Sequence, residues 1–431
     1  MKKLTLYLLL GSCFLACKKE DVIVVNPSQK EALTIDQVIN DSSIVLTWKK
    51  FTGTHFRQYR IIRAATYLKN DQFTMFYDTV FIGTDINVTS FTETKMPVAK
   101  DIYYNLYTDR DTVGVYTPAL TVSYQRPNSV LYCQPNDVLF SKAQKKLYII
   151  EQQKIHIVDY ISGRPVLSKE FPTGIGYCAL GTFNGSNELY VPLNDGWVQI
   201  LDATTLELKD RIYVAGFGIG SVLALNGKVY ASSSDRSLSG YSNCVKVFDR
   251  ASKTLIGRTG YWDQTRLVAL EGTAVEMIDL TINQSPVSLA YYSFAADGTP
   301  LVKKEDTYHG DYTMSPSIVR SFPDGSRFIT SGSGTIFNKS LVFDRYIKQY
   351  PGYNDSYTDF AFNTDGSIIY AANGPLKKID IIRYPSTTNT GNYPTKFGPY
   401  KLFRDDNSLI SVSKINTNYS QTCILIENIK L

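Results

Sequence analysis

Histidine is scarce in this 431-residue sequence, and the scarcity limits the chemistry that the chain can support. Only His55, His156 and His309 are present, far apart in the sequence. A Ser-His-Asp triad or a histidine-rich metal site therefore has little material to be built from. We expect no catalytic residues, no metal site and no cofactor, and a chain that binds a ligand without catalysing a reaction.

Other catalytic motifs are also missing or incomplete. Ser331–Gly334 is one glycine short of a G-x-S-x-G nucleophile elbow. Gly216–Gly220 is rich in glycine but lacks the βαβ context of a phosphate-binding loop. Carboxylates that are distant in the sequence can still meet in the folded chain, so an exported lyase, lactonase or hydrolase stays as the alternative function.

Cysteine is sparse and unevenly placed. Of six cysteines, Cys13 and Cys17 lie near the N-terminus. The other four form no CxxC pair and are Cys133, Cys178, Cys244 and Cys423. This spacing argues against a zinc knuckle or a thioredoxin-like motif. We expect buried, unpaired thiols, with disulfides of unspecified pairing as the alternative.

Long runs of basic or apolar residues are absent as well. The formal net charge is only +5, and no basic run is long enough for a nucleic-acid track, so we expect no nucleic-acid partner. What the chain has in quantity is aromatic residues, with 31 Tyr and 21 Phe in a composition that is 43% hydrophobic. Tyr and Phe favour strands, so the composition indicates an all-β globular protein.

The N-terminus has the pattern of an export signal. Lys2 and Lys3 precede the apolar run 4–10, which is too short to span a bilayer, and small residues lead to Cys17. Residues 14–17 resemble a bacterial lipobox, although Phe14 departs from the usual aliphatic residue. The resemblance implies that Cys17 is acylated, residues 1–16 are a lipoprotein signal peptide and residues 17–28 are a tether. Residues 10–13, ending in Cys13, are a competing lipobox.

The residues that follow Cys17 suggest a destination. The stretch 18–21, Lys-Lys-Glu-Asp, resembles the charged tag that sends some lipoproteins of Gram-negative bacteria to the cell surface. It implies a chain held by its lipid in the outer membrane and exposed at the surface, with the periplasmic face as the alternative. Cleavage by an ordinary signal peptidase would instead give a soluble periplasmic protein.

Residues 29–126 contain six or seven short alternating strands, which predict a β-sandwich. Leu-Thr-Trp at 46–48, Tyr-Arg-Ile-Ile-Arg at 59–63 and Tyr-Tyr-Asn-Leu-Tyr at 103–107 resemble, in that order, a fibronectin type III domain. The resemblance implies that Trp48 and Tyr104 are core residues and that the domain is a spacer or contact surface.

Residues 127–431 repeat a pair of apolar strands about every forty residues, and the second strand of each pair often ends in Asp. The Asp residues assigned to this position are Asp159, Asp202, Asp249, Asp344 and Asp380, and we expect them to fix turns. Tight turns at Asn226-Gly227, 323–325 and 364–366 precede Tyr- or Phe-containing strands. Four strands per unit without a helical period predict a β-propeller of about seven blades, in which residues 130–132 return to complete the last blade.

The repeats resemble the YVTN and lactonase-like β-propeller families through Phe-Pro-Asp-Gly-Ser at 322–326 and Trp-Val-Gln-Ile-Leu-Asp at 197–202. That resemblance implies the fold and does not define an activity.

The loops that lead from an outer strand to the next inner strand each carry an aromatic residue, and in a propeller these loops surround one mouth of the channel. Aromatic rings suit sugars or peptide side chains. We therefore predict a glycan or protein partner bound through the propeller, with a structural role in an envelope assembly as a further alternative. The candidate ligand-binding residues are Tyr177, Phe217, Tyr261, Trp262, Tyr308, Tyr312, Tyr353, Tyr357, Phe397 and Tyr400.

Overall fold

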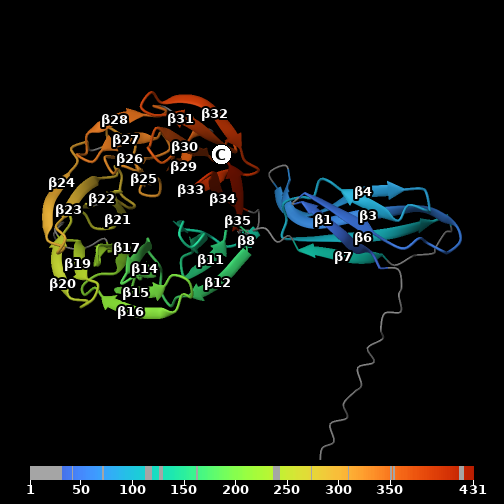
Figure 1. Ribbon diagram of the computed structural model, residues 1–431, viewed down its shortest axis with the longest axis horizontal. Coiled ribbons are helices and arrows are strands. Elements are labelled where there is room, and N and C mark those ends of the chain that lie inside the picture. Colours follow the sequence, from blue (N-terminus) through green and yellow to red (C-terminus); the bar gives the residue numbers. More distant parts are fainter. Residues whose placement is uncertain are drawn as a thin grey trace, which may run out of the picture.

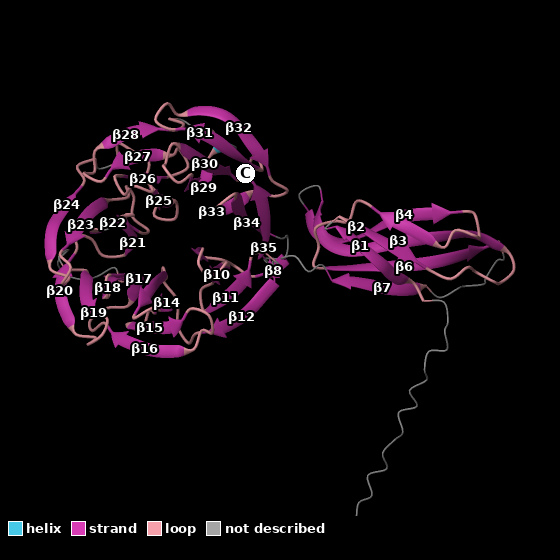
Figure 2. Ribbon diagram, in the orientation of Figure 1, coloured by secondary structure: helices cyan, strands magenta, loops and turns pink. Residues whose placement is uncertain are grey.

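Strands make up nearly all of the regular structure in the computed structural model (Figure 2). The all-β prediction is therefore confirmed. The residues described are 32–40, 42–69, 72–111, 119–125, 130–161, 164–235, 243–272, 274–308, 310–349, 352, 355–416 and 422–431. The predicted signal peptide, the tether with Cys17, and His309 and Tyr353 lie outside them. Within these ranges, no helix is long and apolar enough to cross a membrane.

The first part of the chain forms two sheets around one core (Figure 1). The three-stranded sheet has the order β1 (Thr34–Asn40), β2 (Ser43–Thr47) and β5 (Ser90–Glu93). The four-stranded sheet has the order β4 (Gln72–Gly83), β3 (Phe56–Lys69), β6 (Asp101–Arg110) and β7 (Leu120–Gln125). Trp48 and Tyr104 are both buried, as the sequence predicted, and Trp48 packs edge-on against Tyr59 with ring centroids 5.5 Å apart.

The rest of the chain forms seven four-stranded antiparallel sheets arranged in a ring (Figure 1). In six of them four consecutive strands run from the centre outward. They are β9 (Asp137–Ser141), β10 (Lys146–Ile150), β11 (Lys154–Asp159), β12 (Arg164–Glu170); β13 (Ala179–Phe183), β14 (Ser186–Pro192), β15 (Trp197–Asp202), β16 (Leu208–Tyr213); β17 (Ile219–Leu225), β18 (Lys228–Ser233), β19 (Val245–Asp249), β20 (Leu255–Thr259); β21 (Thr265–Ala269), β22 (Val275–Thr281), β23 (Leu289–Phe294), β24 (Pro300–Glu305); β25 (Val319–Ser321), β26 (Arg327–Thr330), β27 (Thr335–Asn338), β28 (Phe343–Tyr346); β29 (Tyr357–Phe362), β30 (Ile368–Asn373), β31 (Lys378–Arg383), β32 (Thr388–Pro394).

The seventh sheet joins the two ends of the ring. Its order is β33 (Pro399–Asp405), β34 (Ser408–Asn416), β35 (Thr422–Lys430) and β8 (Val130–Tyr132). The outermost strand thus comes from before the first sheet, and Leu131 pairs with Ile424. The predicted return of residues 130–132 is confirmed. Hydrogen bonds between β8 and β35 therefore oppose opening of the ring.

The turn chemistry is partly as predicted. Asn226 and Gly227 both have positive φ, as a tight hairpin requires. Asp159 and Asp202 accept hydrogen bonds from backbone N–H groups two residues ahead, and Asp249 from one three residues ahead, so these three do fix turns.

Two of the assigned Asp residues lie elsewhere in their sheets. Asp344 lies on the outer strand β28, and the turn after β27 is fixed by Asn338, whose side-chain oxygen accepts from Ser340 N–H. Asp380 is buried in the middle of β31 and forms an ion pair with Lys378, with the two charged atoms 2.9 Å apart. At Asp344 the prediction was wrong because Asn338 supplies the same kind of acceptor oxygen one turn earlier. At Asp380 it was wrong because β31 continues three residues further, to Arg383.

The apolar cores lie mostly between neighbouring sheets, and Cys133, Cys178 and Cys423 belong to them. The four described cysteines are buried and unpaired, as predicted. Burial raises the pKa of Cys133 to about 12 and that of Cys423 to about 11, which suppresses the reactive thiolate. Val98, from the first part of the chain, packs against the cluster that contains Cys423 and Leu425.

Candidate ligand-binding site

The aromatic residues predicted to bind a ligand divide into two groups in the structure. Phe217, Tyr357 and Phe397 are buried and pack within or between the sheets. The partly buried group consists of Tyr177, Tyr261, Trp262, Tyr308, Tyr312 and Tyr400. Only members of the second group have surface to offer a ligand.

Three of these six rings already carry a cation from their own chain. Arg266 lies over Tyr177 at 4.1 Å from the ring centroid, Lys303 over Tyr261 at 3.9 Å, and Lys401 over Tyr400 at 5.3 Å. Such contacts stabilise the loops and occupy the ring faces that a sugar would stack on. Arg266 and Lys303 are distant in the sequence from Tyr177 and Tyr261, so no local pattern indicates these two contacts, whereas Lys401 directly follows Tyr400.

Tyr312 belongs to an aromatic cluster beside a hollow. Its ring stacks on Phe343 with centroids 4.2 Å apart, and Tyr308 packs edge-on against it at 4.7 Å. The hollow next to it has a volume of about 880 Å³, and its lining includes Asp311, Tyr312 and Arg345. Tyr312 is therefore a predicted ligand-binding residue that lines a cavity.

The centre of the ring is crossed by ion pairs. Arg266 of β21 binds Asp137 of β9 at 3.0 Å, and Lys401 of β33 binds the same carboxylate at 3.3 Å. Arg320 of β25 holds Asp359 of β29 through two hydrogen bonds of 2.9 and 2.6 Å. These residues come from five different inner strands, so the network ties opposite sides of the ring together.

The electrostatics of the network follow from burial. Burial opposes ionisation of Asp137, but the charges of Arg266 and Lys401 outweigh it, and the pKa of Asp137 is lowered. Burial lowers the pKa of Lys401, against the opposing effect of Asp137. With the side chains committed to one another, the network is better suited to holding the ring closed than to binding a ligand.

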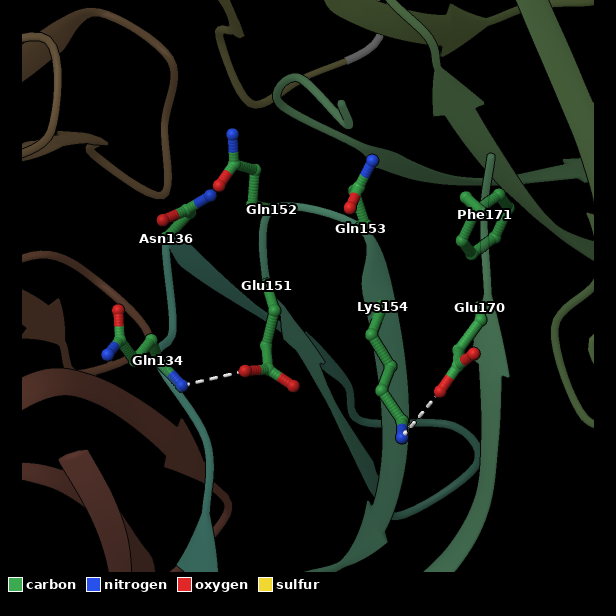
Figure 3. A pocket seen from close by; sticks show the side chains of 8 residues that line it. All are labelled: Gln134, Asn136, Glu151, Gln152, Gln153, Lys154, Glu170 and Phe171. Atoms are coloured by element: carbon green, nitrogen blue, oxygen red, sulfur yellow. Dashed lines mark hydrogen bonds and ion pairs between the residues drawn. The ribbon is translucent and has the colours of Figure 1, made fainter. Parts of the chain in front are cut away.

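A second pocket, of about 560 Å³, lies beside the sheet of β9–β12 (Figure 3). Residues before β9, the turn between β10 and β11 and the end of β12 all reach it, since these segments emerge at the same end of the sheet. Its lining is polar apart from one aromatic ring. The lining residues are Gln134, Asn136, Glu151, Gln152, Gln153, Lys154, Glu170 and Phe171.

The charges in this pocket are compensated within the chain. Glu151 accepts a hydrogen bond of 2.7 Å from the backbone N–H of Gln134, and its other oxygen lies 2.7 Å from Nε2 of His156. Lys154 and Glu170 form an ion pair of 3.1 Å (Figure 3). The remaining polar surface consists mainly of side-chain amides, which both donate and accept hydrogen bonds.

Sequence reasoning missed this pocket. Its residues come from three segments that are adjacent only once the sheet has formed, and none of them is among the ten aromatic residues predicted from the sequence. The one available sign was the pair Gln152-Gln153, two long amides at a hairpin turn where Asn, Asp or Gly is more usual. The described residues contain no group of three or more His, Cys, Asp or Glu side chains placed to hold a metal ion.

Comparisons with known proteins define the class of fold. No protein-family model matches the sequence, and no curated protein matches it. Among solved structures, hydrazine synthase from Kuenenia stuttgartiensis is similar with a TM-score of 0.51 and 13% identity, over 69% of this chain and 95% of that chain. The RRP9 WD40 repeats give a TM-score of 0.49 and 11% identity, over 70% of this chain and 99% of that chain.

The arrangement of the sheets and the likeness to the first of these structures define a β-propeller. At 13% identity the likeness shows the fold alone, so the chemistry of hydrazine synthase is not carried over to this chain.

Proposed function

We propose that this chain is an exported lipoprotein that binds a glycan at the amide-lined pocket of a seven-bladed propeller. The anchor would be the acylated Cys17 in the outer membrane, with the protein exposed at the cell surface. The first two sheets would be a fibronectin type III-like spacer between the anchor and the propeller.

The observation that carries the proposal is the chemistry of the pocket lining. Sugar hydroxyl groups donate and accept hydrogen bonds, and the amides of Asn136, Gln152 and Gln153 do both. Phe171 adds an apolar ring, which suits the C–H face of a sugar. Because Glu170 is paired with Lys154, the pocket does not demand a charged ligand. A neutral or weakly charged glycan therefore fits this lining better than a ligand that carries a net charge, such as a nucleotide or a charged peptide.

The spacer proposal is supported by strand order. In a fibronectin type III domain a sheet of the first, second and fifth strands packs on a sheet of the other four. The orders β1-β2-β5 and β4-β3-β6-β7 agree with that arrangement. The proposal of a membrane anchor is supported by the sequence pattern of residues 1–21 alone.

Affinity electrophoresis of the full-length protein in mild detergent, through gels that contain one of a panel of polysaccharides, tests the proposal. We expect one glycan to retard the protein, and the variants Asn136→Ala and Gln152→Ala to migrate faster in that gel. Gln37→Ala removes an exposed amide from β1, in the first part of the chain, and is the matched control. Retardation by no polysaccharide, or retardation unchanged in both pocket variants, would overturn the proposal.

A further inference from the structure

Three side chains on the sheet of β9–β12 form a continuous chain of hydrogen bonds. Oε1 of Glu151 lies 2.7 Å from Nε2 of His156, and Nδ1 of the same imidazole lies 2.7 Å from Oγ of Ser168. His156 is buried whereas Ser168 is exposed. This is the order of a carboxylate that orients a base, a base, and a hydroxyl nucleophile open to solvent.

The backbone explains why Ser168 and His156 are so close. They are register partners on the antiparallel strands β12 and β11. The N–H of Phe171 donates to the carbonyl of Gln153, so alternate residues back from Phe171 turn their N–H groups toward β11. Ser168, three residues back, belongs to the other set. It therefore faces His156 in a non-hydrogen-bonded pair, where side chains approach most closely, and its own N–H points to the open edge of the outermost strand.

The tautomer of the imidazole follows from its partners. A carboxylate accepts hydrogen bonds, so Glu151 holds the ring proton on Nε2, which leaves the lone pair of Nδ1 for the hydroxyl of Ser168. Glu151 also lines the pocket of Figure 3, and Glu170, another lining residue, is two positions from Ser168 on the same side of β12. Two positions along a strand are about 7 Å, so Ser168 lies one side-chain position beyond the pocket lining on that strand.

We propose that Ser168, His156 and Glu151 hydrolyse carboxylic esters of small acyl groups. Oγ of Ser168 attacks the ester carbonyl, and its proton moves to Nδ1 of His156. The bond from the carbonyl carbon to the alkoxy oxygen breaks, and the alcohol leaves with that proton. Water then attacks the acyl carbon, and one of its protons moves to Nδ1. The bond from the acyl carbon to Oγ breaks, Oγ takes that proton from Nδ1, and the carboxylic acid leaves. Glu151 stabilises the imidazolium in both halves, and the N–H of Ser168 donates to the oxyanion.

The same reaction does not depend on the proposed glycan. Ser168 and His156 are not among the residues that line the pocket, so loss of ester hydrolysis in their variants leaves glycan retardation as a separate measurement. An ester carried on a glycan would contact both the amide-lined pocket and the hydrogen-bonded chain. A simple ester would contact only the hydrogen-bonded chain.

Two measurements on the full-length protein test the proposal. The first is hydrolysis of p-nitrophenyl acetate, for which we expect kcat/KM to fall at least 100-fold in Ser168→Ala and in His156→Gln. Ser123→Ala, which removes an exposed serine from β7, is the matched control and leaves the rate unchanged. The second is labelling by a fluorophosphonate, with the modified residue located by peptide mass spectrometry; the label is expected on Ser168.

A third variant separates chemistry from misfolding. In Ser168→Cys we expect iodoacetamide to react more than tenfold faster than in the double variant Ser168→Cys/His156→Gln, because the imidazole withdraws the thiol proton. Equal rates in those two variants, a label that is absent or spread over other serines, or a hydrolysis rate unchanged in Ser168→Ala would each overturn the proposal.

Discussion

Arg266 and Asp137 lie on strands β21 and β9, which belong to the fourth and first sheets of the ring, yet their side chains meet at 3.0 Å. At least two sheets separate them in either direction around the ring, so the contact spans its centre. Arg266 also donates to the carbonyl of Pro316 at 2.8 Å. A single guanidinium thus connects three inner segments that are far apart in the sequence.

Replacing this guanidinium is expected to destabilise the ring strongly. Arg266→Met leaves the buried carboxylate of Asp137 with Lys401 as its remaining cation. Removing one member of a buried ion pair costs about 3–5 kcal/mol, and the remaining lysine places this variant toward the lower end of that range. Urea unfolding monitored by circular dichroism measures the loss.

The double variant Asp137→Asn/Arg266→Met is the control for that loss. With the charge of Asp137 removed, the missing guanidinium matters less, so the double variant is expected to lose less than the sum of the single losses. Additive losses would show that the two side chains do not interact. Since the pKa of Asp137 is lowered in the folded chain, the stability it contributes is present above about pH 4 and lost in more acidic solution.

Asp279 predicts a pH dependence of the opposite sign. Burial raises its pKa to about 7, and it accepts a hydrogen bond of 3.0 Å from the hydroxyl of Tyr292. Between about pH 4 and pH 7 the folded chain keeps a proton that the unfolded chain releases, so this group makes stability fall as the pH rises through that window. In Asp279→Asn this fall is expected to disappear, because the amide does not titrate.

Urea unfolding of the wild type and Asp279→Asn at intervals from pH 4.5 to pH 8 makes the comparison. The difference in the free energy of unfolding between variant and wild type is expected to move in favour of the variant up to pH 7 and then level off. A difference that does not change with pH would contradict the raised pKa.

Ring closure by β8 and β35 makes a third prediction. Ile424 is buried at the closing sheet, in the cluster that also contains Ile149 and Val412. Ile424→Ala is expected to lower the free energy of unfolding by about 2–5 kcal/mol, the range for a buried aliphatic residue reduced to alanine. Ile256, on the outer strand β20, is 41% exposed and supplies the matched control. If Ile256→Ala lowers the free energy of unfolding as much as Ile424→Ala does, packing at the closing sheet does not contribute more to stability than an exposed position on an outer strand.

The buried thiols make a fourth prediction, on reactivity. Because burial raises the pKa values of Cys133, Cys178, Cys244 and Cys423, the native chain is expected to leave all four unlabelled by iodoacetamide at pH 8. In urea all four are expected to react. Peptide mass spectrometry reads each site, and rapid labelling of any of them in the native chain would contradict the burial argument.

The sequence predicted most of the fold because the fold depends on local patterns. Alternating strands, the turn at Asn226-Gly227 and the apolar segment at 130–132 each follow from a few neighbouring residues. The error at Asp344 has the same origin, since the local pattern there matched a residue one strand further along.

The candidate sites depend on contacts between residues that are distant in the sequence, and local sequence patterns did not predict these contacts. The cation over Tyr177 comes from residue 266, and nothing near Tyr177 indicates it. The scarcity of histidine argued against a catalytic triad, yet a single histidine, His156, with Ser168 across the strand is enough for the hydrogen-bonded chain. A count of residue types does not show which side chains a sheet places together.

The claim that the amide-lined pocket binds a glycan is tested most directly by isothermal titration with an oligosaccharide of the polysaccharide that retards the protein. Asn136→Ala is expected to weaken binding at least tenfold, whereas Tyr312→Ala, at the other hollow, is expected to leave the dissociation constant unchanged. The reverse result, with binding lost in Tyr312→Ala and kept in Asn136→Ala, would place the site among the loop aromatics and contradict this account.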